Sequence, residues 1–542
     1  MISPASSPGP RMSNITTRSL VLGLLLSIFL PTGVFAQFPL EAEEGDHDFR
    51  VENVFIEARD GIRLHARIWR PIDMDGSVPA ILTLTPYTSD DGHRFGVFYA
   101  SHGFAYVNAD IRGRGESGGE TWPLERDGLD GADIVGWIVN QPWSDGKVGM
   151  RGGSYRGMTQ WQTLKEFPEG LVTIVPTASV HPGWDYPNPS GIFLSYAAQW
   201  LGFVEGEASQ ANLFGDSDYW HGKFLELYAR HGAFSELDDL TGISPRVFER
   251  WIAHPGYDEF WKAMNPAPED YARMAIPILT ITGHFDGDQP GALKYYRDHM
   301  AHGPEHGKAD HYLIIGPWSH GGTRIPQAEL GGLTFGASSV LNMEAVHLAW
   351  FDWTLRDGPK PAFLKDRVAH YVMEADEWRF APSFGEVASG HREWFLSSDG
   401  PVSDVFSSGT LSSEVPDNPG VDELIYDPLV TVDDEIWRES PWAGSYVSGG
   451  QAFHPGPKAV YHSPPLSSSV TVSGYALLEL FIELDVPDTD LLASLYEIRS
   501  NGQTIYLGQS ELRARHRNGV DRSELVTPGR VERYPFDRFY WF

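Results

Sequence analysis

The stretch "KVGMRGGSYRGMTQW", residues 147–161, decides the fold. It begins as a strand-like stretch that ends in two glycines, and after Ser154 the apolar residues recur at helical spacing. A strand, a tight turn and a helix in this order lift a serine hydroxyl above the edge of a parallel sheet. The usual pattern has glycine two residues after the serine, whereas here Arg156 occupies that place and Gly157 follows. We expect Gly157 to let the helix pack closely on the sheet.

A second serine fits the strict pattern better. Ser117 lies in "GESGG", residues 115–119, which has glycine on both sides at the usual spacing. The surrounding "RGRGESGGETWP" is rich in glycine and ends in proline, so no helix can begin directly after Ser117. We therefore predict that Ser154 is a nucleophile and that Ser117 is a loop residue.

A serine nucleophile needs a base, and the base needs an acid that fixes its tautomer. Asp286 follows the strand-like "LTIT" and Asp288 is its rival, while His320 follows the strand-like "YLIIGPW". The chain order Ser, Asp, His, with the last two on loops after later strands, is that of α/β hydrolases. We predict that Ser154, Asp286 and His320 act together.

The order of strand-like and helix-like stretches along the chain predicts an α/β protein with five segments. Short apolar runs alternate with helical stretches in two regions, an aromatic helical stretch interrupts them, and alternating strands follow. The segments are a signal peptide (1–36), the first part of an α/β-hydrolase core (48–183), an inserted helical cap (184–273), the second part of the core (274–360) and an all-β jelly-roll domain (361–542). The charged, apolar and small-residue order of residues 1–36 predicts export to the periplasm or the medium, with Met1 or Met12 as the start.

Charge and cysteine content exclude several functions. The formal net charge is −32, which repels nucleic acid and anionic membranes, and the chain has no cysteine, so disulfides and thiolate sites are excluded. The acidic, tryptophan-rich composition leaves a glycosidase or a non-catalytic carbohydrate-binding protein as alternative functions, although neither needs the Ser, Asp, His order.

The chain also resembles a known family. The pieces that carry the resemblance are "LTPY" (84–87), "DIRGRGESGG" (110–119), "QPWSDGKVGMRGGSYRGMTQW" (141–161), "HPGYDEFW" (254–261), "GHFD" (283–286), "GPWSHGG" (316–322), and "PDTDLLASLYEI" and "LRARHR" in the β region. These resemble the cocaine esterase-like, Xaa-Pro dipeptidyl-peptidase-type serine hydrolases (CocE/NonD), which include α-amino-acid ester hydrolases and glutaryl-cephalosporin acylases.

The resemblance implies the triad of Ser154, Asp286 and His320. It also implies an oxyanion hole made by the Tyr87 hydroxyl and the backbone N–H of Tyr155. It accounts for the displaced glycine, because the family has Gly-x-Ser-Tyr-x-Gly. No metal or organic cofactor is expected.

Three departures from the family are visible. Arg151 sits where the strand is usually apolar. The residues before the predicted triad acid are His284 and Phe285 instead of Trp-Tyr. The chain ends on "ERYPFDRFYWF", and we expect these aromatic residues to leave an exposed apolar edge, as in a C-terminally truncated domain.

The substrate is less defined. By resemblance, Asp258 and Glu259 are candidates to bind a substrate ammonium, with helix capping as the alternative for Asp258. Arg156 could bind a carboxylate or form an ordinary ion pair. Trp184 and Trp318, together with Trp200, are candidate pocket walls, with core packing as the alternative. The sequence leaves open an ester, an amino-acid ester, a β-lactam acyl group or an Xaa-Pro peptide as substrate, and it leaves the oligomeric state open.

Overall fold

The computed structural model describes residues 38, 42, 44–388, 390–417, 420–427, 446–448 and 458–541. The chain divides into the units Met1–Gln37 and Phe38–Phe542, and the description that follows concerns the second. The predicted signal peptide and both candidate start residues lie outside the described residues. No helix in the described part of the chain has the length and apolar character that crossing a membrane requires.

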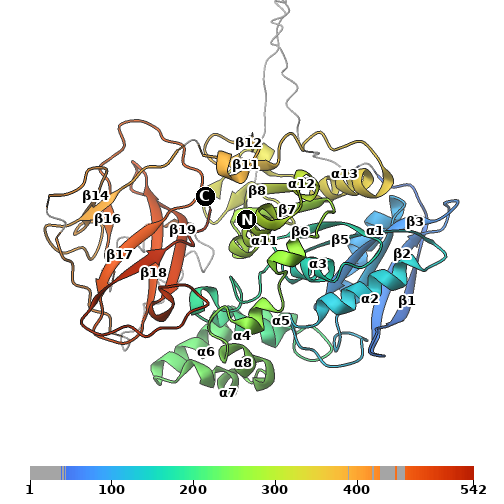
Figure 1. Cartoon of the computed structure of the whole chain (residues 1–542), viewed down its shortest axis with the longest axis horizontal. Coiled ribbons are helices and arrows are strands. Elements are labelled where there is room, and N and C mark those ends of the chain that lie inside the picture. The colour runs from blue at the N-terminus through green and yellow to red at the C-terminus, as the bar shows by residue number, and fades with distance from the viewer. Residues whose placement is uncertain are drawn as a thin grey trace, which may run out of the picture. The chain divides into compact units, whose positions relative to one another are not determined.

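A ten-stranded sheet forms the centre of the protein (Figure 1). Its strands are, in spatial order, β1 (Phe49–Glu57), β2 (Arg63–Pro71), β4 (Ala105–Asp110), β3 (Val78–Thr85), β5 (Ser144–Gly153), β6 (Leu171–Thr177), β7 (Ile278–Phe285), β8 (His311–Ser319), β11 (Val368–Val372) and β12 (Glu377–Ala381). The seven strands from β4 to β11 run parallel, and the pairs at the two ends are antiparallel. The predicted α/β-hydrolase core is confirmed.

Helices cover both faces of the sheet. The helices α2 (Asp127–Val139) and α3 (Tyr155–Lys165) pack in one core cluster, and α1 (His93–Ser101) and α13 (Met343–Arg356) pack in another. Every residue of β3 and β4 is buried, because both faces of these strands are covered. The parallel strands therefore read as continuous apolar runs, and their carboxyl ends meet at one edge, where the site described below is located. The chain after β7 continues in α11 (Gln289–His302) and α12 (Glu305–Ala309), and β9 (Glu329–Leu330) and β10 (Leu333–Thr334) form a small hairpin.

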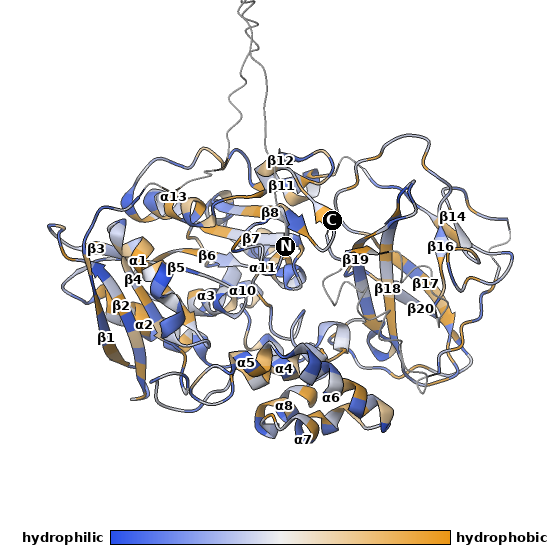
Figure 2. Cartoon of the chain, turned by 180° about the vertical axis from the view of Figure 1, so that it is seen from behind, coloured by the Kyte–Doolittle hydropathy of each residue, from blue (hydrophilic) through white to orange (hydrophobic). Residues whose placement is uncertain are grey.

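Short helices fill the chain between β6 and β7, the region for which the sequence predicts a cap. They are α4 (Ser195–Phe203), α5 (Ala211–Phe214), α6 (Ser217–Ala229), α7 (Leu237–Thr241), α8 (Pro245–Ile252), α9 (Glu259–Lys262) and α10 (Pro268–Tyr271). Hydrophilic and hydrophobic residues mix within α6 and α8 (Figure 2). Such amphipathic helices bury one side and leave the other in water, and Trp220 and Trp251 are buried in the same cluster as α3.

The strands after β12 form a β-rich domain. They are β13 (Phe395–Ser397), β14 (Gly409–Ser412), β15 (Val447–Ser448), β16 (Tyr461–His462), β17 (Leu478–Glu483), β18 (Asp490–Ile498), β19 (Thr504–Arg513) and β20 (Val531–Phe536), in three small sheets among the described residues. The strands β11 and β12 also lie beyond residue 360, where the sequence predicts the β domain. They join the large sheet instead, because β11 is buried along its whole length and pairs with β8.

The expected exposure of the final aromatic residues is wrong. Tyr534, Phe536, Phe539 and Trp541 are at most 5% exposed. Three of them pack in the core of the β-rich domain, while Trp541 packs with residues of β8, β11 and α11. These four aromatic residues are thus internal packing elements.

Candidate active site

Ser154 lies in the sharp turn between β5 and α3. Its backbone has φ 64° and ψ −128°, a conformation that costs free energy for a residue with a side chain and that clusters at functional sites. A Cβ atom at Gly157 would come within 3.0 Å of both the Ser179 Cβ and the Thr177 carbonyl oxygen. The absence of a side chain at this position lets α3 approach β6, as we expected.

Asp286 and His320 are hydrogen-bonded at the ends of β7 and β8. His320 Nδ1 is 2.8 Å from Asp286 Oδ1. The same carboxylate accepts the Asp288 backbone N–H at 3.0 Å and the Thr282 hydroxyl at 2.8 Å, and Asp286 is 1% exposed. A buried carboxylate with fixed partners holds an imidazole in one orientation and tautomer.

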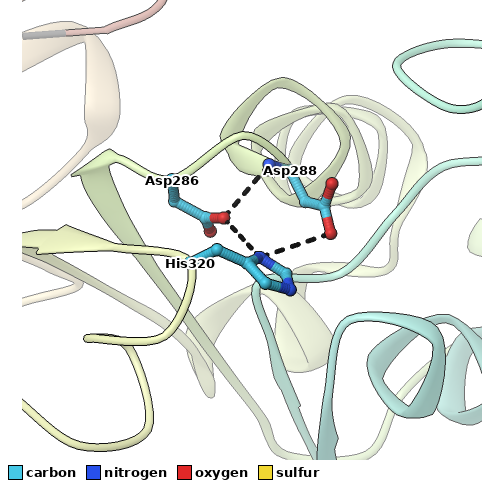
Figure 3. Close-up of side chains that lie close together, drawn as sticks. All are labelled: Asp286, Asp288 and His320. Atoms are coloured by element: carbon cyan, nitrogen blue, oxygen red, sulfur yellow. Dashed lines mark hydrogen bonds and ion pairs between the residues drawn. The ribbon is translucent and has the colours of Figure 1, made fainter. Parts of the chain in front are cut away.

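Asp288 contacts both His320 and Ser154. Its Oδ2 atom is 3.4 Å from His320 Nδ1 and accepts the Ser154 hydroxyl at 3.5 Å. The carboxylates of Asp286 and Asp288 extend from one turn toward the same ring nitrogen (Figure 3). Asp286 has the shorter contact and is fully buried, whereas 18% of the Asp288 side chain is exposed. Asp286 therefore has the geometry of the orienting acid, and Asp288 is the carboxylate open to a ligand.

The charges of the site shift the pKa values of these groups. Burial acts to lower the pKa of His320, but the carboxylates of Asp288 and Asp286 outweigh it and the pKa is raised. Burial raises the pKa of Asp288 to about 6, against the opposing effect of His320. The site thus raises the pKa of both groups, to about 6 for Asp288.

Tyr87 and Tyr155 are joined by a tryptophan of the cap. The Tyr87 hydroxyl accepts the Trp200 indole N–H at 3.2 Å, and the Tyr155 ring stacks on Trp200 with 5.4 Å between ring centroids. Burial raises the pKa of Tyr87, and hydrogen bonds from Trp200 and Ser154 act against that rise. The Tyr155 hydroxyl donates a hydrogen bond to the Asp127 carboxylate at 2.5 Å. Only the backbone N–H of Tyr155 is therefore left to bind a ligand.

The predicted ammonium-binding role of Asp258 and Glu259 is not supported by their contacts. The Asp258 carboxylate caps α9 by accepting the Phe260 backbone N–H at 3.1 Å, and it lies 2.6 Å from His254 Nδ1. Glu259 is 90% exposed and pairs with Lys262 at 3.0 Å. The helix-capping alternative for Asp258 is therefore correct, because an N-terminal helix amide is a strong local partner for aspartate.

The predicted tryptophan walls differ in position. Trp318 is 1% exposed and its indole N–H donates to the Ser339 carbonyl oxygen, so it is a core residue. Trp184 is half-buried, and the Arg538 guanidinium lies 3.6 Å from the centre of its ring, with the Lys294 ammonium at 4.8 Å. The pocket-wall prediction is thus wrong for Trp318 and stays a prediction for Trp184.

Arg156 forms an ion pair beside the site. Its guanidinium is 3.0 Å from Asp91 and lies 5.4 Å from the centre of the Tyr87 ring. Of the two roles considered for Arg156, carboxylate binding and an ordinary ion pair, the structure contains the ion pair. Ser117 is a buried loop residue, as predicted, since its hydroxyl accepts the His65 backbone N–H and donates to the Asp110 carbonyl oxygen.

Two titratable residues near the site were missed from the sequence. Asp185 is buried, and its oxygens accept the backbone N–H groups of Gly291 and His181 at 2.7 and 2.8 Å. Burial and the nearby Asp288 carboxylate raise the pKa of Asp185 well above its usual range. Arg324 lies against Gly153, and its buried Nη1 atom has no hydrogen-bond partner. Only the position of Arg324, four residues after His320, could have drawn attention to it.

The group of Asp286, Asp288 and His320 is also the one cluster of metal-ligand type in the described ranges. Their ligand atoms lie within 4.8 Å of one another. An ion bound there would compete for the His320 nitrogen that contacts Asp286. The expectation of a metal-free site therefore stays a prediction.

Comparison with known proteins identifies both halves of the chain. Residues 60–322 match the family model of the X-Pro dipeptidyl-peptidase (S15 family), and residues 361–537 match that of the X-Pro dipeptidyl-peptidase C-terminal non-catalytic domain. The cocaine esterase of Rhodococcus sp. (strain MB1 Bresler) is 26% identical over 522 residues, which cover 90% of this chain and 86% of that protein.

Two solved structures have a similar fold. An aminopeptidase from a marine sediment archaeon (Thaumarchaeota archaeon) has a TM-score of 0.74 at 22% identity, covering 92% of this chain and 87% of that one. An α-amino acid ester hydrolase has a TM-score of 0.71 at 20% identity, covering 94% and 88%. At these identities the structures establish the shared fold.

Proposed function

This chain belongs to the X-Pro dipeptidyl-peptidase (S15) family and is a serine hydrolase, and on this premise we propose that Ser154, Asp286 and His320 are its catalytic triad. The hydrogen bond between His320 and Asp286 and the strained turn at Ser154 support the proposal. The family assignment favours this function over a glycosidase or a carbohydrate-binding protein.

The reaction is acyl transfer through a covalent intermediate. His320 takes the proton of the Ser154 hydroxyl, and the serine oxygen attacks an ester or amide carbonyl. The protonated imidazole is stabilised by the Asp286 carboxylate and then protonates the leaving alcohol or amine. Water, activated by the same histidine, releases the acyl group and restores the serine. No step requires a metal ion or an organic cofactor.

The oxyanion that forms during the attack is bound by the Tyr87 hydroxyl and the Tyr155 backbone N–H. Two donors aimed at the developing charge are the usual requirement of this chemistry. Trp200 supports the role of Tyr87, because its N–H occupies a lone pair of the tyrosine oxygen and leaves the hydroxyl proton for a ligand.

We further propose that the preferred acyl group carries a protonated amine. The observation that carries this proposal is the partly exposed Asp288 carboxylate, 3.5 Å from the Ser154 oxygen. An α-amino group is two bonds from the attacked carbonyl carbon, so it falls within reach of Asp288 when Ser154 attacks. The substrate class is therefore amino-acyl esters or amides with a free amino terminus.

Export through residues 1–36 is part of the proposal and rests on their sequence alone. Fractionation of cells that produce the full chain, with amino-terminal sequencing of the product, would test it.

Active-site labelling and a substrate panel test the proposed function. A fluorophosphonate should modify Ser154 in the folded protein, and Ser154→Ala should abolish both labelling and turnover. In the panel, p-nitrophenyl acetate is compared with p-nitrophenyl esters of free and N-acetylated amino acids and with Xaa-Pro amides. Turnover that persists in Ser154→Ala would refute the mechanism, and equal kcat/KM for free and N-acetylated amino-acid esters would refute the amine preference.

A further inference from the structure

Residues Arg538–Trp541, which begin one residue beyond the end of β20, connect the β-rich domain to the active site. We call them the 538–541 segment. They follow directly on the residues matched by the C-terminal non-catalytic domain. Phe539 and Trp541 are buried in two different cores, while Arg538 and Tyr540 alternate with them and are half-buried. The segment is therefore anchored by Phe539 and Trp541, while Arg538 and Tyr540 on its other side can contact residues near the active site.

The backbone of Trp541 is hydrogen-bonded to one buried side chain of the hydrolase core. Gln289 accepts the Trp541 N–H at 2.7 Å and donates to the Trp541 carbonyl oxygen at 2.8 Å. Its amide also donates to the Gly283 carbonyl oxygen at 3.0 Å, and Gln289 is fully buried. The amide of Gln289 thus pairs with the 538–541 segment as a neighbouring strand would.

Further contacts hold the same part of the core. The Trp541 ring stacks on His284, with 5.1 Å between ring centroids and 19° between ring planes. The Tyr540 hydroxyl is 3.5 Å from the Gly287 carbonyl oxygen. Residues 284, 287 and 289 flank Asp286 and Asp288 in the sequence. The 538–541 segment therefore contacts the turn that carries both carboxylates at three positions.

We propose that Gln289 and Trp541 are positioning residues, which hold the Asp286–Gln289 turn so that Asp286 and Asp288 stay against His320. The proposal rests on the proposed function of these carboxylates. If Trp541 has this role, the β-rich domain contributes to catalysis, because its last described residues hold the Asp286 carboxylate in place. A displacement of about 1 Å at such a site costs about 10²-fold in rate.

The test compares Gln289→Met and Trp541→Ala with a control in the same domain. Phe536→Leu is the control, because Phe536 is buried in the β-rich core and belongs to a different cluster from Trp541. Fluorophosphonate titration counts the reactive sites, so kcat is expressed per site, and melting temperatures report the folded state. The pH profile of kcat/KM reports the pKa of His320.

We expect Gln289→Met and Trp541→Ala to lower kcat per site by about 10²-fold and to move the acidic limb of the pH profile to lower pH. The limb moves because the carboxylates that raise the pKa of His320 are no longer held beside it. Phe536→Leu should lower the melting temperature only, and Trp541→Phe, which keeps an aromatic ring on His284, should restore most of the wild-type behaviour.

The outcomes separate this proposal from the function on which it rests. If both variants change only the melting temperature, as the control does, the positioning role is refuted while the triad stands. If the wild-type protein shows no labelling of Ser154, the proposed function itself fails. If Trp541→Ala does not fold, Gln289→Met carries the same test, because it removes only the side-chain hydrogen bonds.

Discussion

The Oδ2 atom of Asp288 lies 3.5 Å from the Oγ atom of Ser154, so a carboxylate faces the proposed nucleophile at the distance of a long hydrogen bond. Asp286, two residues earlier, lies 2.8 Å from His320 Nδ1 and has the geometry that orients the imidazole. One turn thus supplies two carboxylates that share His320, of which Asp286 lies closer to the imidazole and Asp288 also contacts Ser154. Their different burial predicts different roles, and substitutions should separate them.

Asp286→Asn should lower kcat by about 10⁴-fold with every substrate, because the asparagine favours the wrong imidazole tautomer. The folded state should persist, since asparagine has nearly the same shape. Steady-state kinetics with p-nitrophenyl acetate, together with circular dichroism, checks both points. A loss of less than 10-fold would mean that Asp288 is the orienting acid.

Asp288→Asn should act selectively. For an ester of a free amino acid we expect KM to rise about 10- to 100-fold, the effect of losing one hydrogen bond to a charged group. For the N-acetylated ester, which has no ammonium, KM should stay within 2- to 3-fold of wild type. The ratio of kcat/KM for the two esters is the measurement. An equal loss for both would contradict ammonium binding.

The pH profile should have its acidic limb above the ordinary histidine pKa of about 6.5. The base must be neutral to act, and its pKa is raised in the site, so activity is lost as the pH falls through that raised value. Asp288→Asn removes a charge that raises the pKa of His320 and should move the limb to lower pH.

Arg324→Gln should have the opposite effect. The Arg324 charge lowers the pKa values of both His320 and Asp288, so its removal should move the limb to higher pH. Shifts of Arg324→Gln and Asp288→Asn in the same direction would show that another group controls the limb. The N-acetylated ester is the substrate for both profiles, because it avoids the titration of the substrate amine.

Tyr87→Phe should lower kcat by about 10²- to 10³-fold, the typical effect of losing one oxyanion-hole donor. Trp200→Phe keeps an aromatic ring to stack on Tyr155 but loses the N–H that contacts Tyr87, and we expect a smaller loss in kcat. In the double variant the second substitution should add little, because Trp200 acts through the Tyr87 hydroxyl. Additive losses would show that Trp200 acts independently.

Gly157→Ala should destabilise the protein by about 1–3 kcal/mol, since a new methyl group at 3.0 Å from two neighbours forces α3 away from β6. Chemical denaturation of the full chain checks the value. Gly136→Ala is a matched control in α2, because its new Cβ would meet nothing within 4 Å. It should leave stability unchanged or improve it slightly, because alanine favours the helix.

The sequence predicted the parts of this protein that depend on local order. The turn at Ser154 could be identified because a strand, a glycine pair and a helical repeat all occur within 15 residues. Asp286 and His320 could be identified because each follows an apolar run. The sequence could not predict that β11 and β12 join the large sheet. A buried strand has the same apolar pattern in either domain, and only the pairing of β11 with β8 decides its sheet.

The substrate-facing residues were harder to predict for a related reason. Asp258 and Asp288 are both aspartates in polar loops, and only the folded chain shows that one caps its own helix while the other faces Ser154. The position of Trp541 depends equally on contacts with residues about 250 positions away in the sequence. Contacts of that range leave no periodic signal.

Trp200 brings the cap into contact with the proposed oxyanion hole, which limits how the protein can be re-engineered. The indole comes from α4, yet it contacts both tyrosines of the proposed oxyanion hole. Exchanging the cap for that of a relative, a common way to alter selectivity, would therefore also alter the turnover number. A chimera would need an indole, or another N–H donor on a flat ring, at the same place. Libraries that diversify the cap should keep Trp200 fixed.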